Sequence, residues 1–316
     1  MAAGTASTPR GADFALVRYN SDGSLDPSFG GQGTVTTDFF GADNGIESIL
    51  VMADGRILAG GYAVNSRTVS VFALALYDSS GGLDRSFGNS GKATFEFLGQ
   101  GDYARTVALQ PDGKIVVGGT VTSNHTGVSG LVRLNDDGSL DSSFGAGGRV
   151  TTDFISLFET LGLQPDGKIL VAGGGGYVDR VKGPLAGFAL TRFNADGSVD
   201  TGFGSDGKVV TALSGRGDWV VSVRIQPNGR ILAAGPSWIP DTLNFNFVVA
   251  GYNPDGRPDA SLGVGGTAID SFFTKQSYIY SVVFQSDGKA VAIGHTGKYG
   301  HGHSSFAVAR YSVGTD

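Results

Sequence analysis

One recurring position of this chain carries acidic, basic, aliphatic and aromatic side chains in turn. Seven residues before each of five Asp-Gly or Asn-Gly turns, the sequence places Glu47, Arg105, Glu159, Val221 and Tyr280. Two carboxylates and a guanidinium in one cleft could bind a polar ligand or supply an acid and a base of shifted pKa. The alternative is that these charges only neutralise one another beside a water-filled channel. The candidate catalytic residues are Glu47, Arg105, Glu159 and Tyr280.

Several polar and aromatic residues accompany these positions and are candidates for ligand binding. Trp219 and Trp238 are the only tryptophans, and such rings suit stacking on a sugar or an apolar ligand, although simple packing is the alternative. Arg224 takes a place that is small or apolar in the other four copies. The candidate ligand-binding residues are Asp102, Tyr103, Asp218, Trp219, Arg224, Trp238, Tyr278 and His301.

Three of the four histidines fall in the segment GHTGKYGHGHSS, as His295, His301 and His303, and His125 occupies the equivalent loop of another repeat. A His-x-His pair in an extended segment points both rings to one face and can bind a metal. No carboxylate stands close in sequence, so we favour solvated loop histidines and expect no metal site.

The pattern NSDGSLD, with Asn20, Asp22, Ser24 and Asp26, has the alternating oxygen ligands of a calcium loop. It lacks the distal bidentate Glu, so a turn in which Asp22 accepts a backbone hydrogen bond is favoured. The sequence has no phosphate-binding loop, no G-x-S-x-G elbow and no H-E-x-x-H motif, and we expect no cofactor.

These candidates sit on a repeat of about 58 residues. The block FALVRYNSDGSLDPSFG at Phe14–Gly30 returns, with changes, from Phe72, Ser129, Phe188 and Phe247, and in part from Phe306. A second block of the type QPDGKIVVGG lies between these copies and begins at Met52, Gln110, Gln164, Gln226 and Gln285.

Each repeat divides into four short strands. The first two are joined by an Asp-Gly turn, which tolerates the positive φ of a tight hairpin. Four antiparallel strands per unit, repeated radially, predict an all-β fold of the β-propeller type. Turns account for part of the 53 glycines among 316 residues, and we expect the Ala/Gly pairs of the second strands, such as Gly60-Gly61, to allow close packing between blades.

The motifs QPDGKILVAG, FALxRYNxDGSLD and SFGxGG resemble the delta-60 repeat, a DUF5122-type bacterial β-propeller family, over nearly the whole chain. The resemblance implies a propeller, typically on exported or surface proteins, and transfers no catalytic residues.

The strand count predicts five four-stranded blades in one domain, residues 14–316, after a flexible segment, residues 1–13. In this arrangement the last blade is completed by Gly33–Phe39 and by one of two equivalent strands. These two strands are Phe14–Tyr19 and Phe306–Tyr311. The surplus strand packs outside or pairs with a second molecule, which makes a monomer or a strand-paired dimer. Six blades, one of them partial, are the alternative.

Charge and composition limit the partners. The net charge is −6 without a Lys/Arg cluster, which argues against nucleic acid, and no apolar run reaches the length of a membrane span. The start, MAAGTASTPRGAD, is typical of a mature or trimmed end. The absence of cysteine is compatible with the cytoplasm and equally with export, and the family resemblance implies an extracellular or cell-surface location.

Residues that break the repeat are the ones expected to carry function, because the repeated residues maintain the blades. We therefore predict a ligand- or partner-binding propeller whose top-face axial pocket takes a carbohydrate or small polar metabolite. The alternative is a propeller enzyme, a hydrolase, lyase or cyclase, with acid/base residues in the same pocket.

Overall fold

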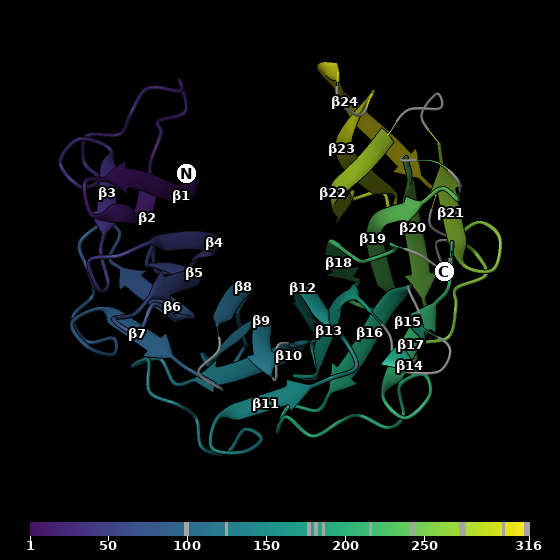
Figure 1. Cartoon of the computed structure of the whole chain (residues 1–316), viewed down its shortest axis with the longest axis horizontal. Coiled ribbons are helices and arrows are strands. Elements are labelled where there is room, and N and C mark those ends of the chain that lie inside the picture. The colour runs from purple at the N-terminus through teal and green to yellow at the C-terminus, as the bar shows by residue number, and fades with distance from the viewer. Residues whose placement is uncertain are drawn as a thin grey trace. The chain divides into compact units, whose positions relative to one another are not determined.

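The computed structural model of the chain consists of β-strands and turns (Figure 1). It describes residues 1–97, 101–123, 126–175, 178–179, 183–184, 187–214, 217–240, 242, 244–271, 276–298 and 301–312. The chain divides into two compact units, Met1–Thr151 and Thr152–Asp316. The described part contains no helix long and apolar enough to cross a lipid bilayer.

The first unit holds three antiparallel sheets, which follow one another in chain order. A three-stranded sheet contains β1 (Ala2–Thr8), β2 (Gly11–Val17) and β3 (Thr34–Thr37). The next sheet contains β4 (Asn44–Val51), β5 (Ile57–Val64), β6 (Ser70–Tyr77) and β7 (Lys92–Phe95). The third contains β8 (Asp102–Leu109), β9 (Ile115–Ser123), β10 (Thr126–Leu134) and β11 (Arg149–Thr152).

The second unit repeats the plan. One sheet contains β12 (Leu157–Leu163), β13 (Ile169–Gly174), β16 (Phe188–Phe193) and β17 (Lys208–Thr211), and a small ribbon pairs β14 (Val178–Asp179) with β15 (Gly183–Pro184). The next contains β18 (Ser222–Ile225), β19 (Ile231–Trp238), β20 (Phe245–Tyr252) and β21 (Thr267–Asp270). The last contains β22 (Gln276–Phe284), β23 (Ala290–Lys298) and β24 (His301–Tyr311).

The sheet count corrects the expected five blades. Within the described residues there are six sheets of three or four strands, and the N-terminal strands form a sheet of their own. The reason is β1, which lies in the segment expected to be flexible and pairs with β2 from Ala2 opposite Val17 to Thr8 opposite Gly11. The N-terminal strands were expected to complete the sheet of the last repeat. Instead, β2 pairs with its neighbours in the chain, β1 and β3.

Each hydrophobic core lies between two neighbouring sheets of the same unit. In the first unit, Leu58 and Leu74 of one sheet pack with Val107 and Val117 of the next. The first strands of adjacent sheets, β4 and β8, lie side by side (Figure 1). A hydroxyl ties these strands together, because Ser48 Oγ accepts a hydrogen bond from the backbone N of Val107 at 3.3 Å.

The same hydroxyl contact recurs in the second unit, where Ser222 Oγ accepts from the backbone N of Val282 at 3.3 Å. A small hydroxyl residue precedes every turn by six positions, and these two contacts confirm that its role is structural.

At the far ends of the sheets, an Arg–Asp pair over a phenylalanine ring joins the third strand to the following turn. Arg133 Nε lies 2.7 Å from Asp141 Oδ2, and its guanidinium lies 4.7 Å from the centre of the Phe144 ring. The set Arg18, Asp26 and Phe29 and the set Arg192, Asp200 and Phe203 have the same geometry.

Phenylalanines of this motif also connect neighbouring repeats. The ring of Phe87 is so close to Gly138 that a Cβ there would lie 2.9 Å from it, and the backbone N of Gly88 donates to Asp137 O at 2.7 Å. Phe29 against Gly81 and Phe203 against Gly256 repeat the contact.

Two repeats lack the arginine of the third strand. In these repeats an arginine of the hairpin turn balances the charge of the aspartate. Where the third strand has Leu76 or Gly251, the hairpin turn ends in arginine instead of lysine. Arg56 then lies 3.8 Å from Asp84, and Arg230 forms an ion pair with Asp259. The aspartate is therefore neutralised in every described copy of the motif, by one route or the other.

We predict that Asp141→Asn destabilises the protein by about 3 kcal/mol, since it removes the carboxylate that balances the charge of the buried Arg133. Burial alone would raise the pKa of Asp141, but hydrogen bonds from Ser143 and Lys114 and the charge of Arg133 outweigh it and hold that pKa well below its usual value. The stability from a lowered pKa is present above the unfolded value and is lost as the pH falls below about 4.

Denaturant melts between pH 7 and pH 2.5 measure this effect. The variant should be less stable at pH 7 and lose less stability on acidification than the wild-type protein. The exposed carboxylate of Asp153 serves as the control, and equal behaviour of Asp153→Asn and Asp141→Asn would refute the assignment.

Candidate functional site

The candidate catalytic residues all stand at the same backbone irregularity. The pairing of the first and second strands shifts register between Ile46 and Ser48, and the residue skipped is Glu47. Equivalent shifts skip Arg105, Glu159 and Tyr280. In the fourth full repeat, the backbone N of Val221 donates to Ala234 O, although Ala234 already pairs with Ser222, so Val221 holds the same extra position. A β-bulge of this kind turns its side chain away from the regular alternation.

A glycine opposite each bulge makes room for it. A Cβ on Gly61 would overlap the carbonyl oxygen of Gly45, two residues before the bulge. Gly119, Gly173, Gly235 and Gly294 meet the same carbonyl of their own repeats, those of Tyr103, Leu157, Trp219 and Tyr278. The second glycine thus makes room for the bulge, and in two repeats it also packs against the preceding sheet as expected, because a Cβ on Gly119 would meet Phe72 and one on Gly294 would meet Phe247. The first glycine, Gly60, packs closely against Val107 of the next sheet.

In the first unit the bulges bring Glu47 and Arg105 together. Arg105 Nη1 lies 3.3 Å from Glu47 Oε2, and about a third of each side chain is exposed. Arg105 Nε is buried without an acceptor among the described residues. The rings of Tyr62 and Tyr103 lie beside this pair with centroids 5.1 Å apart. Burial, followed by the charges of Asp43 and Glu47, raises the pKa of Tyr62.

Asp102 and Asp218 are buried carboxylates that hold loops. Asp218 accepts hydrogen bonds from Ser214, from Ser237 Oγ at 2.7 Å and from the backbone N of Trp238 at 3.1 Å. Asp102 Oδ2 accepts from the backbone N of Phe97 at 2.9 Å, and burial raises its pKa. Because both residues are buried, neither carboxylate belongs to the exposed surface at the bulges.

In the second unit the bulge of β22 carries a group of aromatic rings. Tyr278 lies between Trp219 at 6.0 Å and His295 at 5.7 Å, and its ring is parallel to that of His295. Tyr280 stacks on the same imidazole at 5.4 Å and is 61% exposed. Phe245 completes the group, because its ring centre lies 5.1 Å from that of Trp238 and 4.8 Å from that of Tyr278.

Sequence reasoning missed three of these participants. Tyr62 and Phe245 are absent from the candidates, and His295 was considered only as a metal ligand. The sequence contains a signal for two of them. Tyr62 directly follows Gly61, and His295 directly follows Gly294, the glycines that lie opposite a bulge. A side chain at this position turns towards the bulged residue.

The other predicted residues have their own surroundings. Glu159 is half-buried at the bulge of the second unit's first strand, and Arg224 is exposed and donates to the carbonyl of Val223 at 2.8 Å. His125 and the side chains of His301 and His303 lie outside the described residues. Among the described residues, no group of three or more His, Asp or Glu is placed to hold a metal ion.

The turn expected in place of a calcium loop is confirmed. Asp22 Oδ1 accepts hydrogen bonds from the backbone N of Ser24 at 2.9 Å and from Ser24 Oγ at 2.6 Å. These bonds explain the recurrence of the Asp-Gly-Ser sequence by turn formation alone.

Comparison with known families gives one match. The model described as "Domain of unknown function (DUF5122) beta-propeller" matches four segments, residues 2–29, 53–87, 110–144 and 164–203. No curated protein matches the sequence.

Several solved structures match the chain at low sequence identity. The β-propeller domain of the Trilobed protease from Pyrococcus furiosus shares 12% identity over 84% of this chain and 68% of its own, with a TM-score of 0.44. A calcium-binding protein, regucalcin, from Agrobacterium tumefaciens shares 14% identity over 89% and 80%, with a TM-score of 0.41. A glucose dehydrogenase shares 10% identity over 99% and 96%, with a TM-score of 0.47.

We predict that Gly119→Ala destabilises the protein by about 2 kcal/mol, because the new methyl group would meet the carbonyl oxygen of Tyr103 and force the bulge to move. Gly4→Ala is the matched control, since a Cβ on that strand glycine meets no atom within 4 Å. Thermal unfolding followed by circular dichroism compares the two. Equal melting temperatures would show that the bulge does not depend on its glycine.

Proposed function

Because four repeats of this chain belong to the DUF5122 β-propeller family, we propose that the chain is a ligand-binding propeller whose bulge residues contact a carbohydrate or small polar metabolite. The observation that carries this proposal is the exposed ring of Tyr280, held at a bulge by stacking on His295.

The aromatic group of the second unit has the features that sugar recognition uses. A sugar ring places its C–H face on an aromatic side chain while its hydroxyls bond to polar groups around it. Tyr280 offers an accessible ring, and Tyr278 and His295 behind it add a phenol and an imidazole. The buried contacts of Phe245 and Trp219 fix the orientation of these rings, so little side-chain entropy is lost on binding.

The polar group of the first unit complements this chemistry. A guanidinium donates and a carboxylate accepts, and the pair of Arg105 and Glu47 therefore presents both partners for a hydroxyl or a carboxylate. The buried Nε of Arg105 has no acceptor among the residues that the structure describes, and an unpaired buried N–H costs free energy. Tyr103, 42% exposed, lines the same surface.

Catalysis remains the alternative function. A hydrolase, lyase or cyclase would need Glu47 or Glu159 as a free acid or base, and Glu47 already forms an ion pair with Arg105. Binding without turnover therefore suits the geometry better. The extracellular or cell-surface location and the choice between a monomer and a strand-paired dimer remain predictions as well.

We predict that Tyr280→Ala weakens binding of the glycan identified in a glycan screen by about five- to tenfold, in proportion to the loss of one aromatic contact. Tyr19→Ala is the control, because Tyr19 is an exposed tyrosine, 48% accessible, that stands outside the bulged strands. The quenching of tryptophan fluorescence on titration reports binding, since Trp219 lies 6.0 Å from Tyr278. Equal affinities of the two variants, or no glycan bound by the wild-type protein, would refute the proposal.

We also predict that Arg105→Ala abolishes binding of the polar ligand while the circular dichroism spectrum stays that of the wild-type protein. The half-exposed arginine contributes little to the fold, so the loss reflects missing hydrogen bonds to the ligand. Calorimetric titration with hits from a metabolite and glycan screen measures the effect, and unchanged binding of every hit would remove Arg105 from the site.

A further inference from the structure

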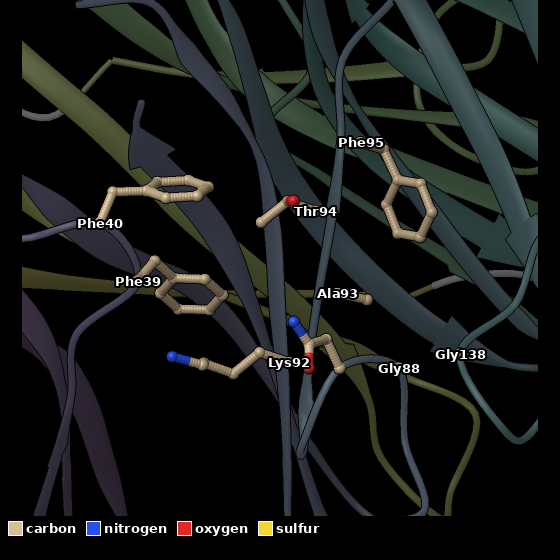
Figure 2. A pocket seen from close by; sticks show the side chains of 9 residues that line it. Phe39, Phe40, Gly88, Lys92, Ala93, Thr94, Phe95 and Gly138 are labelled. Carbon is tan, nitrogen blue, oxygen red and sulfur yellow. The ribbon is translucent and has the colours of Figure 1, made fainter. Parts of the chain in front are cut away.

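A cavity of about 350 Å³ lies in the first unit, away from the bulges. It is formed between the corner that follows β3 and the edge strand β7 of the next sheet (Figure 2). The residues that line it include Phe39, Phe40, Gly88, Asn89, Lys92 and Thr94. A volume of this size holds a small organic molecule.

The aromatic wall of the cavity consists of Phe39 and Phe40. Phe39 is anchored by an edge-on contact with Phe14, with ring centres 4.9 Å apart. Phe40 is 48% exposed, and Figure 2 shows both rings facing the strand that carries Lys92 and Thr94. The equivalent of Phe40 in the corner between β11 and β12 is Ile155, which is fully buried. An exposed ring here is therefore not required by the repeat.

The charged group of the cavity is the ammonium of Lys92. It lies 5.5 Å from the centre of the Phe39 ring and donates one hydrogen bond to Asp38 O at 2.9 Å. An ammonium has three N–H donors, so two remain for a ligand. The side chains of Asn89 and Thr94 line the same space and have no hydrogen-bond partner among the described residues.

We propose that this cavity binds a small monocarboxylic acid with a flat aromatic body. The aromatic body would lie against Phe40 and Phe39, and the carboxylate would receive hydrogen bonds from Lys92. The single cation of Lys92 balances a single negative charge. The nearby backbone N–H groups cannot add further bonds, because that of Gly88 already donates to Asp137 O and that of Asn89 to Lys92 O. A phosphate, with its higher charge, would lack partners here.

The contact of Lys92 with Phe39 has a matched counterpart, which supplies the control. Lys208 lies 5.2 Å from the ring centre of Phe154 in the second unit, where Ile155 replaces the exposed ring. Removing either lysine deletes the same packing contact, and only Lys92 faces the cavity described above.

The test is a calorimetric titration with 2-naphthoate and with its neutral analogue 2-naphthamide. We expect the wild-type protein to prefer 2-naphthoate. Lys92→Gln should weaken naphthoate binding at least tenfold and remove the preference over the amide, whereas Phe40→Ala should weaken both probes. Lys208→Gln should bind both like the wild type.

Two results would overturn the proposal. One is the absence of 2-naphthoate binding to the folded wild-type protein. The other is an equal effect of Lys92→Gln and Lys208→Gln, which would assign any binding to another surface. Glycan binding by the bulge residues should be unchanged in Lys92→Gln, so the two proposals fail independently.

Discussion

The structure depends on a glycine that faces a backbone carbonyl in each of five repeats. Gly61, Gly119, Gly173, Gly235 and Gly294 allow the carbonyl two residues before the bulge to approach the second strand more closely than any side chain would permit. The bulge in turn sets the hydroxyl residue that follows it against the next sheet, as the contacts of Ser48 with Val107 and Ser222 with Val282 show. One missing Cβ thus links hairpin geometry to the packing between sheets.

The same constraint explains where chemical variety is tolerated. The bulged side chain leaves the regular alternation, so neither the core nor the strand pairing restricts it, and glutamate, arginine, valine and tyrosine all occur there. At the opposite ends of the sheets the situation is reversed. There the aspartate of the Arg–Asp–Phe motif always has an arginine or lysine near it. Where the strand arginine is absent, an arginine of the hairpin turn takes its place, as Arg56 and Arg230 show. The repeated Arg–Asp–Phe contacts and the variable bulge position therefore lie at different ends of each sheet, and the proposed recognition uses the variable one.

Much of this organisation could be read from the sequence. The period of about 58 residues, the Asp-Gly turns and the variable position before them located the strands and the bulge side chains, because turn chemistry and alternation are local properties. The five-blade count was wrong because β1, from Ala2 to Thr8, shares no motif with the other strands. The exchange of arginine between strand and turn, the ring group around Phe245 and the cavity at Phe40 depend on contacts between residues far apart in the chain, which periodicity cannot reveal.

The central claim is that recognition resides at the bulges, and fluorine NMR of protein labelled with 3-fluorotyrosine tests it most directly. Substitution of single tyrosines assigns the resonances, and the glycan found by screening is then titrated. The account predicts that the resonances of Tyr278 and Tyr280 shift first and most, while those of the buried Tyr77 and Tyr252 stay in place. Shifts confined to tyrosines outside the bulged strands, such as Tyr19, would contradict it.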